Sequence, residues 1–295
     1  MPVHPQRPHI LVVNGRKVRE PVFVIAAPGS GGDVVARALK RSAGFHVTIG
    51  QRWVLPVVHG FARRPSLSRD RGGAAATVLR DALAQGWQVS PDCCLGCTRQ
   101  CHEAAGQPGV APCVNADEVT RYGDASPDLM YCVGSLLDAF PDARVIQVIR
   151  EGRDAVAGMM SDPSVLAWFR PGFVDIDAEY PHPLLGLEDA ADATAWLRLS
   201  PAGKCAMRWR GSVRQMARLR ARLSTAQLMT IRYEDMVREP RAATTQASQF
   251  LQARVCPFDP AQAGEPGSWR RRLTPAQVAE IESVAYGELR RLGYG

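Results

Sequence analysis

Short apolar runs alternate with amphipathic stretches along this chain. Residues 22–26 and 144–149 are rich in β-branched residues, and each run ends in a polar turn. Such runs, bounded by turn residues, are typical of buried strands. Further strands are predicted at 46–49 and 228–231. Strands that alternate with helices predict an α/β fold with a central parallel sheet.

Helices are predicted where apolar residues recur three and four positions apart. This pattern or a capping signal marks four segments, residues 32–43, 71–85, 126–140 and 204–223. The last helix is predicted to begin at Thr274, because Thr-Pro-Ala-Gln forms a capping box there. Its buried stripe is predicted to consist of Val278, Ile281, Ala285, Leu289 and Leu292.

The predicted elements suggest how the chain is organised. Residues 1–20 form an N-terminal arm, and residues 21–295 have the length of one α/β domain. Two segments interrupt the alternation of strands and helices within this domain. The first, residues 91–113, is a cysteine-rich insertion, and the second is residues 162–202. Residues 162–202 hold five prolines and several aromatic residues. A segment this long predicts a lid or acceptor-binding loop, and an apolar excursion packed on the core is the alternative.

The turn after residues 22–26 carries a candidate phosphate site. Pro28-Gly-Ser-Gly-Gly-Asp33 lies between a predicted strand and a predicted helix. A glycine-rich turn in this position directs backbone N–H groups toward an anion at the positive end of the helix dipole. Arg150 follows the strand at 144–149, at the edge of a parallel sheet where ligands collect. One such turn plus one arginine suggests a ligand with two separate phosphate groups.

Several motifs resemble the sulfotransferase superfamily, whose members use 3′-phosphoadenosine 5′-phosphosulfate (PAPS). The glycine-rich turn is similar to the family's loop for the 5′ end of the nucleotide. Arg150-Glu-Gly-Arg-Asp is similar to its motif for the 3′-phosphate. The similarity continues at residues 140–146, 231–240 and 267–275, so it spans most of residues 21–295. It implies a three-layer, P-loop-like α/β fold.

The resemblance also implies roles for single residues. Gly29, Ser30, Gly31 and Gly32 would hold the 5′-phosphosulfate. Arg150 and Gly158 would lie at the 3′-phosphate, and Tyr233 near the adenine. Arg270 and Arg271 match the family's late basic stretch.

This chain departs from the family pattern in the phosphate loop. The family has a basic residue where this chain has Gly29, threonines at Gly32 and Asp33, and a serine at Gly158. Backbone N–H groups remain, since glycine permits close approach to an anion. Gly29→Arg, which restores the basic residue, is therefore expected to keep or raise activity.

A histidine is the candidate for the general base of sulfuryl transfer. His46 and His59 lie where the family places its acceptor-side base. His59 is the better candidate, since a turn at Val-Val-His-Gly-Phe could direct it into the cleft. A loop histidine without a role is the alternative.

Five of the eight cysteines fall within 21 residues. Cys94 and Cys97 have the Cys-x-x-Cys spacing of thiolate metal sites, and Cys101 and Cys113 would complete a structural zinc site. A redox or disulfide role is an alternative. Inert thiols are another, because Cys93, Cys97 and Cys101 would share one helix face.

The composition limits the kinds of ligand and the cellular location that are expected for this protein. The net charge is +7, and 33 of the 36 basic residues are arginine, which suits a polyanionic cofactor or nucleic acid. The charge is spread along the chain without a nucleic-acid-binding module, so nucleic acid is not expected. No apolar run of about 18 residues suggests a membrane span. The start of the chain lacks a secretory pattern, which predicts a cytoplasmic protein.

These features predict a PAPS-dependent sulfotransferase that acts on a hydroxyl of a small-molecule acceptor, such as a phenol or a natural product. The alternative is a catalytically degenerate binding or scaffold protein with a cysteine-held metal. A nucleotide-hydrolysing P-loop enzyme is disfavoured, because the lysine of Gly-x4-Gly-Lys-(Ser/Thr) is missing.

Overall fold

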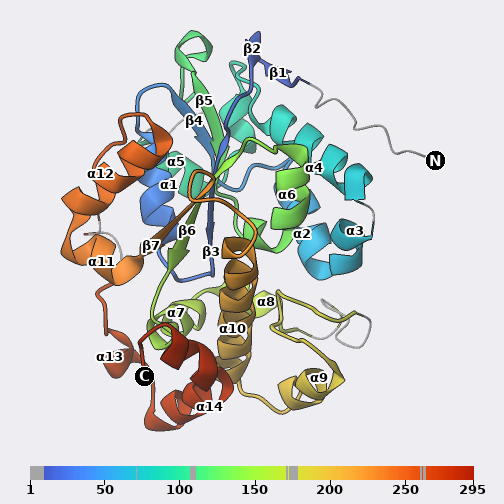
Figure 1. Ribbon diagram of the computed structural model, residues 1–295, viewed down its shortest axis with the longest axis vertical. Helices are drawn as coiled ribbons and strands as arrows, with labels where there is room; N and C mark the ends of the chain where they lie inside the picture. Colours follow the sequence, from blue (N-terminus) through green and yellow to red (C-terminus); the bar gives the residue numbers. More distant parts are fainter. Residues whose placement is uncertain are drawn as a thin grey trace.

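The computed structural model of the protein describes residues 10–70, 72–106, 111–170, 172, 179–259, 261 and 264–295. Its centre is a five-stranded parallel sheet with the strand order β4-β5-β3-β6-β7 (Figure 1). The strands are β3 (Val22–Ala26), β4 (Phe45–Thr48), β5 (Arg121–Asp124), β6 (Arg144–Ile149) and β7 (Leu228–Arg232). Helices flank the sheet, so the predicted α/β fold with a central parallel sheet is confirmed.

The two faces of the sheet carry two separate apolar clusters. In β3, Val22 and Val24 contribute to one cluster, whereas Phe23 and Ile25 contribute to the other. Side chains alternate between the faces of a strand, so both faces of β3 are apolar because both are covered. This explains why β3 reads as a continuous apolar run.

Helices from distant parts of the chain cover these faces (Figure 1). One cluster includes residues of α1 (Gly32–Lys40), α11 (Tyr233–Arg238) and α12 (Pro240–Leu251). The other includes, among others, residues of α2 (Leu55–Arg63), α4 (Gly72–Gly86), α6 (Val133–Ala139), α7 (Gly152–Met159), α10 (Pro201–Arg220) and α14 (Pro275–Arg291).

Shorter helices complete the described structure. They are α3 (Pro65–Arg69), α5 (Arg99–Ala105), α8 (Pro163–Ala167), α9 (Ala190–Trp196) and α13 (Trp269–Arg272), with 3₁₀ turns η1 (Cys93–Gly96), η2 (Ala116–Glu118) and η3 (Leu129–Cys132). The predicted capping box at Thr274 is present at the start of α14. Among the described residues, no helix has the length and apolar character needed to cross a bilayer.

The structure corrects the expected element boundaries in several places. Strand β5 lies between β4 and β3 but was not predicted, because Arg121-Tyr-Gly-Asp124 lacks an apolar run. The predicted helix at 126–140 is a turn, then η3 and α6. Ser126 does not open a helix, because its hydroxyl accepts a hydrogen bond from Gly50 N at 3.1 Å.

The segments predicted as an arm and insertions contain regular structure where they are described. Within 1–20, β1 (Val12–Val13) pairs with β2 (Arg16–Lys17) in an antiparallel hairpin. The cysteine-rich segment 91–113 contains η1 and α5, and its residues 107–110 lie outside the described residues. The segment 162–202 contains α8 and α9, and its residues 171 and 173–178 lie outside them as well.

Candidate functional site

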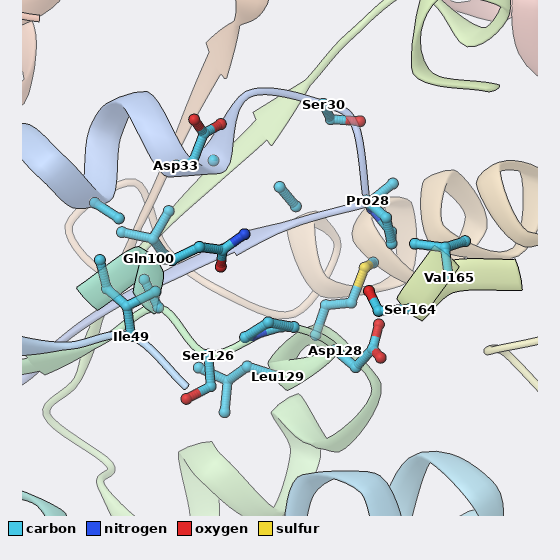
Figure 2. Close-up of a pocket in the computed structure, with 18 of the residues that line it drawn as sticks. Pro28, Ser30, Asp33, Ile49, Gln100, Ser126, Asp128, Leu129, Ser164 and Val165 are labelled. Atoms are coloured by element: carbon cyan, nitrogen blue, oxygen red, sulfur yellow. The ribbon is translucent and has the colours of Figure 1, made fainter. Parts of the chain in front are cut away.

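A cavity of about 570 Å³ opens beside the carboxyl end of β3 (Figure 2). Open parallel sheets bind their ligands at this edge. The wall on one side is the β3–α1 loop, and other walls come from α2, α5, η3 and α8. Its lining includes Ser30, His59, Gln100, Asp128, Trp168 and Arg208.

The β3–α1 loop has the conformation of an anion-binding turn. Gly29 and Gly31 adopt left-handed φ values of 74° and 86°. Gly31 is the N-cap of α1, and Ser30 N donates to Ala27 O at 3.0 Å. The first N–H groups of a helix have no partner within the helix, so the start of α1 offers donors to the cavity. Ser30 is buried, and its hydroxyl has no hydrogen-bond partner among the described residues.

Asp33 lies at the start of α1 and lines the same cavity. Its carboxylate pairs with Arg37 at 2.8 Å, one helical turn further on. The side chain is 56% exposed, and a carboxylate in the first turn is favoured by the helix dipole. This ion pair reduces the repulsion that Asp33 would exert on an anion in the loop.

Gly29 and Gly158 lie against each other. A Cβ at Gly29 would lie 2.6 Å from Ala155 O, and a Cβ at Gly158 would lie 3.1 Å from Gly29 Cα. The loop therefore packs directly on α7 at the two positions where the family resemblance predicts larger residues. The expectation that Gly29→Arg is tolerated is disfavoured by this contact and by the φ of Gly29.

Arg150 is engaged with main-chain carbonyls. Its guanidinium donates to Gly29 O at 3.1 Å and to Gly264 O at 2.9 Å. It also lies over the Tyr233 ring at 4.0 Å, and Tyr233 donates its hydroxyl hydrogen to Gly264 O. Arg150 is 5% exposed, and its Nε has no hydrogen-bond partner in the part of the chain that the structure describes. A phosphate could reach this guanidinium only if the segment at Gly264 moves.

The predicted cofactor residues fall into two groups. Gly29, Ser30, Gly31 and Gly32 line the cavity together with His59. Among the described residues that line it, none belongs to the second predicted group, which consists of Arg150, Gly158, Tyr233, Arg270 and Arg271.

The late basic stretch is anchored by a buried carboxylate. Asp154 accepts hydrogen bonds from Gly267 N at 2.6 Å and Trp269 N at 2.8 Å. Arg270 lies over the Trp269 ring, and Arg271 pairs with Glu265 at 2.8 Å. Asp154 thus fixes the position of this loop, while Glu151 is the residue whose side chain caps α7.

His59 lies on helix α2 rather than in the predicted turn. Its ring meets Trp168 edge to face, with centroids 5.3 Å apart. Burial is the main cause that lowers the pKa of His59, and Arg208 lowers it further, while Asp128 acts in the opposite direction. The neutral imidazole, which is the form that accepts a proton, is therefore favoured at neutral pH.

Asp128 and Arg208 form an ion pair on the cavity wall that sequence reasoning missed. Both are buried, and the carboxylate and guanidinium are hydrogen-bonded to each other. Asp128 adopts a left-handed φ of 64°, which few non-glycine residues do. Within the described residues, Arg208 Nη1 has no hydrogen-bond partner. A lone arginine within the stripe of α10 gave no signal that it faces a cavity.

The four cysteines predicted to bind zinc do converge. Cys94, Cys97, Cys101 and Cys113 line one small cavity of about 10 Å³ with Lys40. Lys40 donates to Cys113 Sγ at 3.2 Å. Within the described ranges, no group of three or more Cys, His, Asp or Glu side chains is arranged to hold a metal ion. Beyond the convergence of the four sulfurs, the described geometry gives no support to the predicted zinc site, which stays a prediction.

Comparison with known proteins gives one family match. A model described as the sulfotransferase family matches residues 21–257. This range covers most of the chain and includes the β3–α1 loop, Arg150 and Tyr233. No match to a curated protein was found.

Solved structures with a similar fold are distant in sequence. The sulfotransferase domain of the Synechococcus PCC 7002 olefin synthase is 18% identical, with a TM-score of 0.47, and the match covers 91% of this chain and 96% of that one. Sulfotransferase STF1 from Mycobacterium tuberculosis H37Rv is 14% identical (TM-score 0.44, covering 94% and 77%). Mouse sulfotransferase SULT7A1, complexed with PAP, is also 14% identical (TM-score 0.44, covering 92% and 86%).

Proposed function

Since the chain belongs to the sulfotransferase family, we propose that it transfers a sulfuryl group from PAPS to a hydroxyl of a small-molecule acceptor. One observation carries the proposal. The β3–α1 loop and His59 line the same cavity, so an anion-binding turn faces a candidate base across a space large enough for a small molecule.

The residues at the loop fit one end of PAPS. The left-handed glycines, the start of α1 and the unpartnered hydroxyl of Ser30 suit the 5′-phosphosulfate. Arg150 is the residue that would hold the 3′-phosphate. To do so it must exchange its carbonyl partners Gly29 and Gly264 for phosphate oxygens. A phosphate adds a negative charge and bidentate geometry that the two neutral carbonyls lack, and this favours the exchange.

His59 is the proposed general base. Burial favours its neutral form, which can accept the proton of an acceptor hydroxyl. Trp168, in edge-to-face contact with His59, gives the cavity an aromatic wall, which suits a planar acceptor such as a phenol.

Negative charge must be stabilised at the loop during transfer. PAPS supplies an activated sulfuryl group when it is bound. The family's basic residue is replaced by Gly29, and Ser30 N is already bonded to Ala27 O. We therefore expect the N–H groups of Gly29, Gly31 and Gly32 to stabilise this charge. We expect Arg270 to add positive charge if the 264–272 segment shifts toward the cavity.

A degenerate protein that binds the nucleotide without transfer is the second candidate. The contact between Gly29 and Gly158 favours it, because this contact fills the space where the family has side chains that bind the cofactor. The carbonyls around Arg150 favour it as well.

Incubation with PAPS and a panel of phenols, alcohols and sugars separates the two candidates. We expect a sulfated product, and we expect His59→Ala to lower turnover by about 10²–10⁴ while PAP affinity is retained, as loss of a general base should. His102→Ala is the matched control, because His102 lines the small cysteine cavity rather than the main one. PAP binding without any sulfated product would favour the degenerate protein.

A further inference from the structure

Arg208 is a buried cation on the wall of the main cavity. It belongs to α10, and only 1% of the residue is exposed. Its side chain forms part of the same cavity lining as His59 and Trp168. Arginine is almost never fully buried unless it is paired, so the partners of Arg208 show what its guanidinium can still bind.

The partners of Arg208 hold the guanidinium in one orientation. Nη2 donates to the Asp128 carboxylate, and Nε donates to the Tyr131 hydroxyl at 3.4 Å. The Tyr131 hydroxyl is hydrogen-bonded to Ser212 Oγ at 2.9 Å, and Ser212 Oγ also donates to Arg208 O at 2.9 Å. The guanidinium cannot turn without losing these contacts.

The remaining nitrogen of the guanidinium, Nη1, is a donor without a partner. It is buried, and no described residue accepts a hydrogen bond from it. Leaving a buried donor unpaired is unfavourable, and nearly all buried donors in folded proteins have a partner. Because Arg208 is part of the cavity wall, an oxygen atom of a bound molecule would supply the missing acceptor.

The charges in the cavity favour a neutral oxygen at this place. Among the described residues that line the cavity, Asp33, Asp128 and Asp162 are acidic, whereas Arg99 and Arg208 are basic. Asp128 already neutralises Arg208, so a carboxylate at Nη1 would gain little attraction from the pair. A carbonyl oxygen accepts the same hydrogen bond without adding negative charge.

The surroundings of Arg208 suit the rest of a planar molecule. Figure 2 shows Asp128 and Val165 at the same end of the cavity, and Trp168 ends the helix α8 to which Val165 belongs. Trp168 contacts the His59 ring edge to face. Asp128 and Arg208 shift the pKa of His59 in opposite directions, so the ion pair lies within electrostatic range of the proposed base.

We propose that Arg208 binds a neutral carbonyl oxygen of the acceptor through Nη1, so that the acceptor is a phenol that carries a ketone, ester or amide group. The inference rests on the proposed function for the statement that the bound molecule is the sulfuryl acceptor. The phenolic hydroxyl lies at His59, the ring lies against Trp168, and the carbonyl oxygen lies at Arg208. Arg208 thus determines specificity and takes no part in proton transfer.

Ligand-detected NMR titration of matched probes tests the proposal in the wild type without nucleotide. Hydroxyacetophenone and ethylphenol, each as its 3- and 4-isomer, differ only in a carbonyl that becomes a methylene. At least one hydroxyacetophenone should bind tighter than the matching ethylphenol by about tenfold or more, because its hydrogen bond to Arg208 is charge-assisted. The matching hydroxybenzoate should bind more weakly than the ketone, because the acidic lining repels its carboxylate.

Variants of Arg208 identify the donor. Arg208→Lys keeps a charge for Asp128 but has only one nitrogen, so it should lose the preference for the ketone and keep the affinity for ethylphenol. Arg208→Met combined with Asp128→Asn should lose the preference too, and it serves if Arg208→Lys does not fold. Arg210→Lys is the matched control, because Arg210 also lies on α10 and pairs with Asp192 at 2.7 Å. Arg210 is not among the described residues of the cavity lining, so its variant should keep the preference.

Several outcomes would overturn the proposal. These are equal affinities for the matched probes in the wild type, no binding of either probe, or a preference that survives in the double variant. Tighter binding of hydroxybenzoate than of the ketone would contradict the neutral acceptor class. The titrations need no turnover, so they are separate from the proposed function. A preference for the ketone without any sulfated product would contradict the transfer reaction and leave the oxygen site in place, whereas equal affinities together with sulfated product would contradict this inference alone.

Discussion

Restoring the family's basic residue at Gly29 should destabilise this protein. Gly29 adopts a φ of 74°, and a Cβ would lie 2.6 Å from Ala155 O. Ala155 O belongs to helix α7, so it cannot turn aside as the end of a flexible side chain could. Gly29→Arg must therefore push the β3–α1 loop away from α7, and Gly29→Ala, which adds only the Cβ, must do so too.

The magnitude follows from two terms. A left-handed non-glycine residue costs about 1–2 kcal/mol, and overpacking against rigid neighbours costs about 1–3 kcal/mol. Their sum of about 2–5 kcal/mol lowers the urea midpoint by roughly 0.7–1.7 M, if m is about 3 kcal/mol per M. Gly15→Ala is the control. Gly15 has a φ of 73°, but a Cβ there would meet no atom within 4 Å.

Urea unfolding followed by circular dichroism measures the difference between the two sites. Gly15→Ala should lose only the backbone term, about 1–2 kcal/mol. Gly29→Ala and Gly29→Arg should both lose more than that. The reasoning is refuted if Gly29→Arg unfolds at the wild-type urea concentration, since the loop and α7 would then have room for the family residue.

Three further predictions concern buried charges and histidines. Arg208→Met leaves the Asp128 carboxylate buried without its partner and should lower the free energy of unfolding by about 3–5 kcal/mol. The double variant with Asp128→Asn should recover much of this loss, as measured by urea unfolding. Burial lowers the pKa of His182, so the unfolded chain binds protons more readily and stability should fall as the pH drops below about 6.5. Acidification should lower the melting temperature of His182→Gln less than that of the wild type. An identical fall in melting temperature would contradict this assignment. The pKa of His59 is also lowered. The acid side of the pH profile of kcat/KM should therefore give an apparent pKa below the ordinary histidine value. An apparent pKa above that value would speak against His59 as the base.

The sequence predicted the parts of the fold whose signal is local. The strands at 22–26 and 144–149 were predicted with the bounds that the structure has, because their apolar runs end sharply at polar turns. The capping box at Thr274 is likewise contained in four consecutive residues. Strand β5 was missed, because its place in the sheet is set by pairing with β3 and β4 rather than by its own residues.

The site was predicted less completely, because its geometry depends on contacts between distant segments. The structure places His59 and the glycine loop in one cavity, while their roles stay predictions. The packing of Gly29 on Gly158 and the pairing of Asp128 with Arg208 are contacts across 80 or more positions. No spacing along the chain reveals them. The two glycine departures look independent in sequence, yet in the structure each makes room for the other.

Calorimetric titration with PAP tests the central claim most directly. If the β3–α1 loop and Arg150 hold the two phosphate groups, the wild type should bind PAP. Arg150→Ala should weaken PAP binding by roughly tenfold to a hundredfold, since a charge-assisted contact contributes about 1.5–3 kcal/mol. The same variant should bind adenosine 5′-phosphosulfate, which lacks the 3′-phosphate, with far less loss of affinity. Arg153→Ala is the control, because Arg153 pairs with Glu151 and Glu282. A wild type that binds no PAP, or equal losses for both nucleotides, would contradict the account.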